Sequence, residues 1–405
     1  MLFRKILGND WTDMFSMNYG KVTTSGEFIS PENAFANIGT IFECIVIRAN
    51  SFSKLPLQLF KYDDTRKVRD RDNPLWYLLE KRPNKYQTPS QFKSYIEVSR
   101  LLWGNAFVEM KFDARGNIIA LEPLEPQYVT IEKNLNNDYI YIYQNSTKRK
   151  VFTEDEILHF PYTSSQGKVG KAPMEVARES VGNLMAINKF EGNFYKNGTM
   201  TTGVLEAAGE LGRPARRKIK EEWKRLYSGV GNAGDIAVID SGLQYKPITL
   251  PLKDMEFIAS RKMNKAEIAT IFDVPSYMLN DIDNAKYTNV EQQNLRYLVD
   301  VLQPEVTAAE EELNYKLFTE KQAKKNFVKF NLNSAMRADS KTRAEYYKEM
   351  LGMGLMSINE ARDKEDLHNI GEIGDKHYMS LNYTTLETLE KHNRIKDTGG
   401  GDSDE

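Results

Sequence analysis

The chain has 405 residues, of which 40% are hydrophobic and 28% are charged. This composition excludes a disordered chain and predicts two or three domains of roughly 150 residues each. The formal net charge is −2, from 55 lysines and arginines against 57 aspartates and glutamates. Tight non-specific binding of nucleic acid is therefore disfavoured, although a local basic patch is compatible with this balance.

Targeting signals and cysteine content indicate the cellular compartment in which the protein is expected. No apolar run approaches the roughly 18 residues of a membrane span. Polar Asn9 and Asp10 come too early for the core of a signal peptide. The single cysteine, Cys44, excludes an internal disulfide and a multi-cysteine zinc site. We therefore expect a protein of a reducing interior, without a membrane anchor.

The N-terminal part predicts one α+β domain behind a flexible arm. Residues 1–30 show no hydrophobic period, so folded structure is expected to begin near Pro31. A helix is predicted from Asn33, with four isoleucines turned inward: Ile38, Ile41, Ile45 and Ile47. An antiparallel sheet and a second helix, ending at Gly104, should follow: strands 57–60, 107–112 and 139–143, and helix 92–103.

Long amphipathic helices dominate the rest of the chain. Three are predicted, over residues 174–196, 255–272 and 290–318, and Pro304 predicts a kink in the last. The first two flank a βαββ unit, expected as helix 214–227 with strands 203–206, 236–239 and 243–246. A strand, two short helices and a solvated tail should complete the chain: 327–332, 342–351, 357–362 and 399–405.

Two glycine-containing segments resemble nucleotide-binding loops only superficially. The G-x-G-x-x-G pattern at 229–234 follows a predicted helix and precedes a strand, the reverse of the dinucleotide fingerprint. The segment 167–171 has Ser165 where a phosphate loop needs glycine, and Ala172 after its lysine. The first segment is interpreted as a mobile turn, and the second gives no support for an ATP site.

Titratable side chains give no positive support for an enzyme. The four histidines, His159, His368, His377 and His392, do not stand at metal-ligand spacing. His159 ends a predicted strand, where a hydrogen-bonded structural role is favoured over a catalytic one. Cys44 is interpreted as a buried, inert thiol. The sequence thus predicts no catalytic residue, no metal site and no cofactor.

Two segments stand out by their charge or polarity. Helix 213–227 has seven basic residues against Glu221 and Glu222: Arg213, Arg216, Arg217, Lys218, Lys220, Lys224 and Arg225. It is either a solvated face or a contact for nucleic acid or an acidic partner. The polar segment 280–289 between two long helices is either an ordinary connection or the moving part of a site.

Several short motifs follow one another along the chain, and their order is informative. The N-terminal ones are Ser53-Lys-Leu-Pro-Leu57, Arg82-Pro-Asn84, Thr88-Pro-Ser-Gln-Phe92, Leu102-Trp-Gly-Asn-Ala-Phe107, Leu121-Glu-Pro-Leu-Glu-Pro126 and Asp155-Glu-Ile-Leu-His159. The later ones are Phe194-Tyr-Lys-Asn-Gly198, Gly203-Val-Leu205, Ile268-Ala-Thr-Ile-Phe-Asp-Val-Pro275 and Gly354-Leu-Met-Ser-Ile-Asn-Glu360. Together, and in this order, they resemble the HK97-type portal proteins of tailed bacteriophages, from about residue 35 to about residue 380.

The resemblance implies an α+β portal fold with named parts. After the arm 1–30, these are the wing (31–165), stem helix one (166–198), clip (199–250) and stem helix two (251–275). The tunnel loop, a long kinked helix and a strand returning to the wing occupy 276–334. A short helical crown and a polar tail follow, at 335–385 and 386–405.

The resemblance also implies a function and partners. Such chains form a ring, usually of twelve subunits, at one capsid vertex, and double-stranded DNA is packaged and ejected through it. The implied partners are the terminase large subunit, the head-completion or adaptor protein, and the major capsid and scaffold proteins. The implied location is the virion, after assembly in the host bacterial cytoplasm. Because the motor of the family is a separate ATPase, the missing phosphate loop agrees with this interpretation.

Three groups of candidate site residues follow from the resemblance. The tunnel loop is expected to face DNA with Asn284, Lys286, Tyr287, Thr288 and Asn289. The channel face of the stem is expected to include Arg178, Lys189, Arg261, Lys262 and Lys265. The clip is expected to meet its partners with Arg213, Arg216, Arg217, Lys220 and Lys224.

Two other functions are compatible with the residues. One is a non-viral scaffold or interaction protein of similar fold, which would be monomeric or dimeric and indifferent to DNA. The other is a nucleic-acid enzyme using carboxylate-bound Mg²⁺, for which no ligand cluster stands out.

Overall fold

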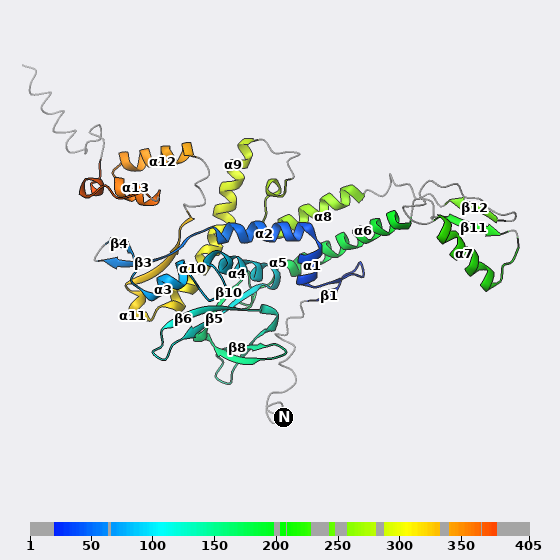
Figure 1. Cartoon of the computed structure of the whole chain (residues 1–405), viewed down its shortest axis with the longest axis horizontal. Helices are drawn as coiled ribbons and strands as arrows, with labels where there is room; N and C mark the ends of the chain where they lie inside the picture. Colours follow the sequence, from blue (N-terminus) through cyan, green and yellow to red (C-terminus); the bar gives the residue numbers. More distant parts are fainter. Residues whose placement is uncertain are drawn as a thin grey trace, which may run out of the picture. The chain divides into compact units, whose positions relative to one another are not determined.

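The computed structural model describes residues 20–63, 66–197, 203–207, 209–227, 243–247, 257–280, 287–332, 340–365 and 367–378. The chain divides into two compact units, Met1–Asn331 and Leu332–Glu405 (Figure 1). None of the described helices is both long and apolar enough to cross a membrane.

A β-hairpin precedes the first helix, so the predicted arm is wrong for residues 20–30. Its strands are β1 (Lys21–Val22) and β2 (Phe28–Ile29). The Thr24 backbone N–H and hydroxyl donate to Glu179 Oε2 at 3.1 and 2.7 Å. A Cβ atom on Gly182 would lie 2.6 Å from Thr23 Oγ1, so glycine permits the close approach. These contacts join positions about 155 residues apart, which a local pattern does not reveal.

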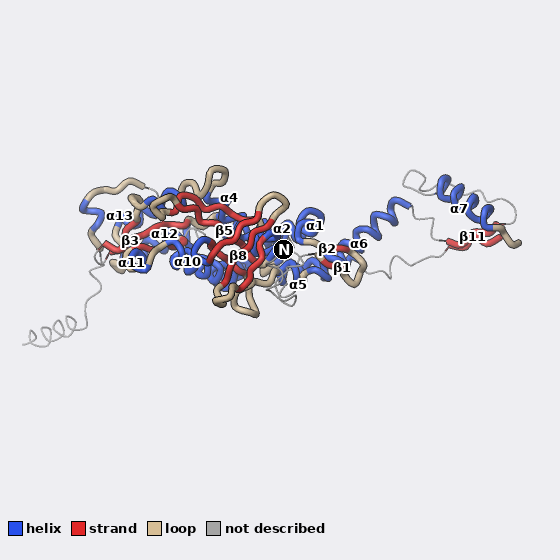
Figure 2. The backbone as a smooth tube through the Cα atoms, turned by 90° about the horizontal axis from the view of Figure 1, so that it is seen from below, coloured by secondary structure: helices blue, strands red, loops and turns tan. Residues whose placement is uncertain are grey.

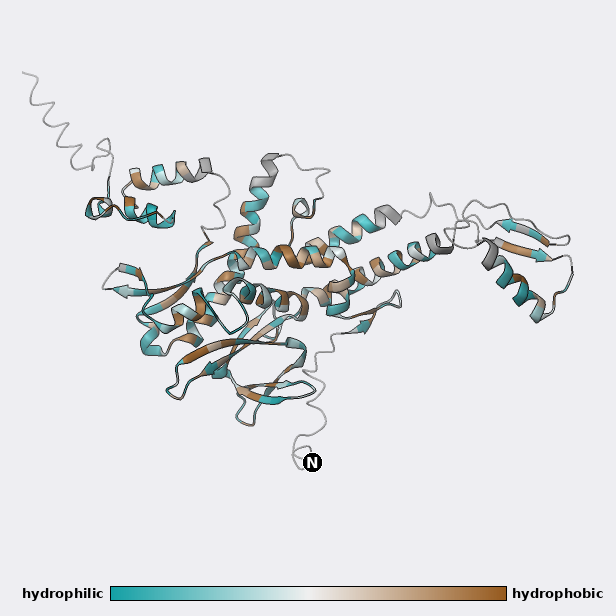
Figure 3. Ribbon diagram, viewed as in Figure 1, coloured by the Kyte–Doolittle hydropathy of each residue, from teal (hydrophilic) through white to brown (hydrophobic). Residues whose placement is uncertain are grey.

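The first predicted helix is two helices, α1 (Pro31–Asn37) and α2 (Gly39–Ser53). Ile38 between them has extended backbone angles, φ −112° and ψ 104°. Ile38, Ile41 and Ile45 are buried as predicted, whereas Ile47 is only half-buried. Hydrophobic residues mark the middle of α2 in Figure 3.

The second predicted helix is confirmed as α4 (Pro89–Trp103), which packs against α2. It begins with a capping box between Thr88 and Gln91 and ends at Gly104, φ +76°. A Cβ atom at Gly104 would lie 2.5 Å from the Gly170 carbonyl oxygen. Both the positive φ and this close approach therefore require glycine. Helix α3 (Pro74–Glu80) lies against β3 (Leu57–Asp63).

The strands of this unit form separate antiparallel sheets, so the prediction of a single sheet is wrong (Figure 2). The first sheet has the order β13 (Asn326–Phe330), β3, β4 (Arg66–Arg69). The second has the order β10 (Ile157–Pro161), β5 (Asn105–Phe112), β6 (Ile118–Leu124). The third has the order β7 (Val129–Lys133), β8 (Tyr139–Gln144), β9 (Arg149–Thr153). The predicted return strand is confirmed, because β13 pairs with β3.

The first two long helices run side by side, as α6 (Arg178–Asn197), preceded by α5 (Pro173–Val176), and α8 (Phe257–Ile271) (Figure 1). Val181 and Leu184 of α6 share a core with Ile268 of α8 and with α2. Val176 and Phe190, which also stand at helical spacing in this segment, are 55% and 43% exposed. Some apolar residues that fit the helical period of this segment therefore lie outside its buried face.

Three elements of the predicted βαββ unit are confirmed. Strands β11 (Gly203–Ala207) and β12 (Leu243–Pro247) pair antiparallel, and α7 (Arg213–Tyr227) lies between them in sequence. The predicted strand 236–239 and the pattern at 229–234 lie outside the described residues.

The third long helix is interrupted where Pro304 predicts a kink. Helix α9 (Tyr287–Arg296) continues through a π-helical segment, η8 (Tyr297–Leu302), into α10 (Gln303–Leu317). Proline has no N–H and its ring crowds the carbonyl four residues earlier, here that of Asp300, so a wider turn is needed before it. A 3₁₀ turn, η7 (Ser276–Leu279), precedes α9, and α11 (Glu320–Ala323) follows α10.

The second unit contains α12 (Ser340–Gly352), α13 (Ile358–Lys364) and the turn η10 (Glu372–Asp375). Ser357 and Glu360 cap α13 reciprocally. Asn359 Nδ2 donates to the Gly371 carbonyl and to Asp375 Oδ1 at 2.9 and 2.7 Å. Both predicted helices are confirmed. The motif at 354–360 contains the N-cap of α13, Ser357, and Asn359, whose side chain hydrogen-bonds to the following turn. The predicted tail lies outside the described residues.

Candidate functional site

A buried guanidinium joins four elements of the first unit. Arg48 on α2 is fully buried, and its Nη1 donates to the Phe272 carbonyl oxygen at 2.7 Å. Its Nη2 lies 3.3 Å from Glu97 Oε1 on α4 and also pairs with Glu305 Oε1 on α10. Arg100 Nη1 closes the group, 2.8 Å from Glu97 Oε2. We call Arg48, Glu97, Arg100 and Glu305 the charge cluster.

The charge cluster contains two cations and two anions, so its buried charges balance. Burial alone would lower the pKa of Arg48, but Glu305 and Glu97 raise it and keep the guanidinium charged. Burial, together with repulsion from Glu97, raises the pKa of Glu305 above its usual range. Each charge is tolerated in this interior because an opposite charge lies beside it.

The same arginine caps the end of α8. Asp273 has a left-handed backbone, φ +52°, and the Val274 N–H donates to the Ala269 carbonyl at 2.9 Å. This pattern closes a helix C-terminus but leaves the last carbonyls without helical partners. The Phe272 carbonyl finds its donor in Arg48, whose positive charge also suits the negative end of the helix.

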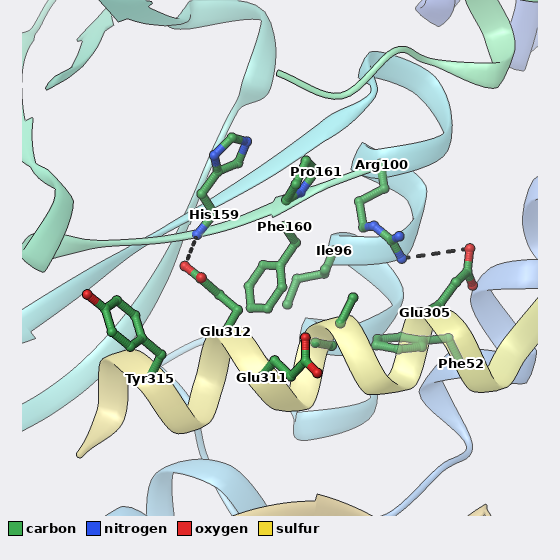
Figure 4. A pocket seen from close by; sticks show the side chains of 12 residues that line it. Phe52, Ile96, Arg100, His159, Phe160, Pro161, Glu305, Glu311, Glu312 and Tyr315 are labelled. Atoms are coloured by element: carbon green, nitrogen blue, oxygen red, sulfur yellow. Dashed lines mark hydrogen bonds and ion pairs between the residues drawn. The ribbon is translucent and has the colours of Figure 1, made fainter. Parts of the chain in front are cut away.

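A cleft of about 360 Å³ borders the charge cluster (Figure 4). Its walls come from α4, β10 and α10, and include Ile96, Phe160 and Ala309. Glu305 and Arg100 line one end, and the His159 backbone N–H donates to Glu312 Oε1 at 2.9 Å further along α10. Helix α10 is therefore attached to the body of the unit at both of these places beside the cleft.

His159 has the structural role that the sequence favours. It is buried, its Nε2 lies 2.9 Å from Asn105 Oδ1, and its Nδ1 lies 3.2 Å from the Tyr141 hydroxyl. The ring stacks on Phe107 with centroids 4.7 Å apart. Burial, with the nearby Lys168 and Lys316, lowers the pKa of His159 to about 3. The imidazole is therefore neutral in the folded chain at ordinary pH.

We expect the neutral His159 to make the fold acid-labile. Between pH 6.5 and 3 the unfolded chain binds a proton that the folded chain does not, so stability falls with acidification. The loss is about 1.4 kcal/mol per pH unit in that range. His159→Gln, which does not titrate, should flatten this part of the pH profile of urea unfolding. An equally steep profile in the variant would contradict the assignment.

The predicted tunnel-loop residues divide into two groups. Asn284 and Lys286 lie outside the described residues. Tyr287, Thr288 and Asn289 form the start of α9, so their prediction as loop residues is wrong. Threonine and asparagine are common at helix N-termini as well as in loops, and the sequence does not distinguish the two.

The predicted stem residues lie on α6 and α8, and Lys189 and Arg261 among them form ion pairs. Lys189 Nζ lies 3.0 Å from Glu27 Oε1, and Arg261 Nη2 lies 2.6 Å from Glu191 Oε2. The remaining three are Arg178, at the first position of α6, Lys262, which is exposed, and the half-buried Lys265. Lys189 and Arg261 are thus partly neutralised within the chain.

The predicted clip residues form an exposed basic surface on α7, which is hydrophilic along its drawn length (Figure 3). Arg216 Nε donates to the Leu211 carbonyl at 2.7 Å, and Arg217 Nε lies 3.8 Å from Glu221. Arg213 and Lys220 are exposed as well. The side chain of Lys224 lies outside the described residues.

Other chemistry is sparse in the part of the chain that the structure describes. No group of three or more His, Cys, Asp or Glu side chains there could hold a metal ion. Cys44 is buried, and burial raises the pKa of its thiol to about 12, as expected for an inert cysteine. Lys168, in the segment 167–171, pairs with Glu154.

A family model described as phage portal protein matches residues 39–366, most of the chain. The chain belongs to this family. The portal protein of Enterobacteria phage HK97 is 28% identical to it over 358 residues, covering 87% of this chain and 84% of that protein. The resemblance inferred from the ordered motifs is confirmed.

Solved structures show the same fold. A chain in the neck of an empty gene transfer agent particle gives a TM-score of 0.59 at 22% identity, covering 83% of this chain and 92% of that one. An HK97 family phage portal protein from Corynebacterium diphtheriae gives 0.57 at 16% identity, covering 76% and 98%. The predicted α+β portal fold is therefore confirmed.

The charge cluster of this portal family member was not predicted. A usable signal was present, because Arg48 stands at helical spacing from Ile41 and Ile45, on the apolar face of α2. A charge at such a position needs a buried partner. The partners lie 49 and 257 residues away, so the sequence alone does not identify them.

Proposed function

We propose that this chain is the subunit of a ring, of about twelve copies, through which double-stranded DNA is packaged into and ejected from a capsid. The supporting observation is the portal family match over residues 39–366. The ring would occupy one capsid vertex in the virion, after assembly in the host bacterial cytoplasm. It would act without catalysis, since the packaging motor would be a separate ATPase.

The mass of the assembled species tests this proposal first. The purified 46.6 kDa chain should give a particle near twelve subunits by mass photometry, with a central hole in negative-stain images. A ring closes because each subunit presents one surface to the next around an axis. A monomer or dimer that persists at high concentration with capsid protein present would contradict the proposal and favour a simple scaffold protein.

The parts of the ring are assigned as proposals. Residues 31–165 would form the wing, α6 and α8 the stem, 199–250 the clip, the segment 276–334 the tunnel loop with its helix and return strand, and 335–385 the crown. The DNA-facing residues of the tunnel loop and the start of α9 would be Asn284, Lys286, Tyr287, Thr288 and Asn289. Those of the stem would be Arg178, Lys189, Arg261, Lys262 and Lys265.

The ion pairs of α6 and α8 suit a passage for DNA. A polyanion moving through a channel has to break each phosphate contact at every step, so tight contacts would stall it. Lys189 and Arg261 already pair with Glu27 and Glu191, and a phosphate would have to compete with those carboxylates. The net charge of −2 supports the same interpretation.

The exposed basic face of α7 would dock the terminase large subunit and later the adaptor protein. Reversing two charges, Arg216→Glu with Lys220→Glu, should weaken docking about tenfold, because each surface pair contributes up to about 1 kcal/mol. Ring assembly should be unaffected. Lys133→Glu with Lys148→Glu, two exposed lysines of the wing, is the matched control. Equal docking by both double variants, measured by surface plasmon resonance, would reject this contact.

A further inference from the structure

We propose that Arg48 is a positioning residue that fixes both ends of the segment 273–304 on one buried guanidinium. This segment connects α8 to α10 and contains η7 and α9. The inference deepens the proposed function and rests on it, because α9 directly follows the proposed tunnel loop.

Both ends of the segment meet at the same side chain. The Phe272 carbonyl, at the last point before the segment leaves α8, accepts from Arg48 Nη1 at 2.7 Å. Glu305, one residue after Pro304, pairs with Arg48 Nη2. Arg48 is itself positioned by α4, because its Nη2 lies 3.3 Å from Glu97 Oε1. Two positions 33 residues apart in sequence are thus bound to one rigid, planar group.

The segment also makes contacts beyond the charge cluster. The Tyr277 hydroxyl pairs with Asn294, a contact within the segment. Lys265 Nζ lies 3.5 Å from the Leu279 carbonyl, at the limit of a hydrogen bond. Leu295 and Val299 on the outer part are 55% and 49% exposed, whereas Tyr297 and Leu302 are buried. Val274 and Leu279 at the start of the segment are buried in the core with α2. Arg48 adds a polar anchor at the point where this core meets the start of α10.

The geometry requires arginine in particular. Three acceptors on three elements surround the group, and a guanidinium presents five N–H donors in a fixed plane. A lysine ammonium keeps the positive charge but is a single point on a flexible stem. We therefore expect Arg48→Lys to keep the fold without holding both ends of the segment.

Hydrogen exchange on the purified full-length chain tests this role. Peptides covering 274–280 and 287–302 should exchange about tenfold faster in Arg48→Lys than in the wild-type chain. The variant Arg48→Met with Glu305→Leu gives a second test, because it removes a cation and an anion together and leaves Glu97 paired with Arg100. It should accelerate exchange in the same peptides.

Ile131→Ala is the matched control, because it destabilises the core around β7, away from the segment. It should leave exchange at 274–280 and 287–302 unchanged under native conditions. Wild-type exchange in Arg48→Lys and in the double variant would overturn the positioning role. Equal acceleration by Ile131→Ala would overturn it too, because a general loss of stability would then explain the effect.

DNA packaging separates this inference from the function on which it rests. We expect the double variant to form rings that package or retain less DNA. Faster exchange with normal packaging and retention would overturn the tunnel-loop part of the proposed function while leaving the anchoring by Arg48 in place. Unchanged exchange would overturn the anchoring, whatever the packaging result.

Discussion

Replacing Arg48 alone by methionine is expected to lower the free energy of unfolding by about 3–5 kcal/mol. The reason is the charge left behind. Glu97 would keep Arg100 at 2.8 Å, but among the described residues Glu305 would retain only Arg100, at 3.9 Å, as a cationic partner in a buried site. The Phe272 carbonyl would also lose its donor, at a further cost of about 1 kcal/mol. Urea unfolding of the single variant at pH 7 measures the loss.

The double variant is expected to recover most of that loss. Arg48→Met with Glu305→Leu removes both charges, and exchanging a buried ion pair for apolar side chains is often neutral or stabilising. The double-mutant cycle should therefore show strong coupling between the two positions. Glu305→Leu alone is the second single variant that completes the cycle. Additive losses in the double variant would show that Arg48 and Glu305 do not act as a pair.

Local patterns predicted the helices well. Helix 92–103 was predicted from its apolar period and its stop at Gly104, and the observed α4 begins three residues earlier, after the capping box of Thr88 and Gln91. Pro304 likewise predicted a break, and a π-helical segment precedes it. Such features depend on neighbours within one or two turns, which a sequence displays directly.

Long-range pairing was not predictable in the same way. The N-terminal hairpin contacts Glu179, and the strands of the first unit divide into several sheets through pairings such as Val328 with Leu59. The charge cluster depends on residues from α2, α4 and α10, and on the end of α8. In each case the stabilising partner lies far away along the chain, so no local pattern carries the information.

The candidate channel residues pose a different problem. The side of a stem helix that faces a channel depends on the neighbouring subunits of a ring, which one chain does not contain. Lys189 and Arg261 illustrate this. The sequence shows two cations on long helices but not their partners, and in the folded chain both pair with glutamates. Their role in contact with DNA stays a prediction.

The other large effect is expected from the segment that precedes α9. Replacing residues 284–288 with an equally long Gly/Ser stretch should leave rings intact but reduce packaged or retained DNA by about tenfold or more, since a loss of about 1.4 kcal/mol in holding DNA is already a factor of ten. The replacement removes Lys286, the one cation of this stretch, from every subunit of the ring. Packaging of a defined DNA, followed by nuclease protection, measures the result.

Because Tyr287 and Thr288 begin α9, the five-residue replacement also removes the start of that helix. A shorter replacement, 284–286, keeps the helix and isolates the contribution of Asn284 and Lys286. The matched control is a Gly/Ser replacement of the exposed turn 134–138, which has the same length and joins β7 to β8. Reduced DNA with both loop variants and normal DNA with the control would assign the effect to DNA contact by the loop. Normal DNA with 284–286 and reduced DNA with 284–288 would instead assign it to the start of α9, whose position we attribute to Arg48. Full packaging and retention with both would remove this segment from the channel.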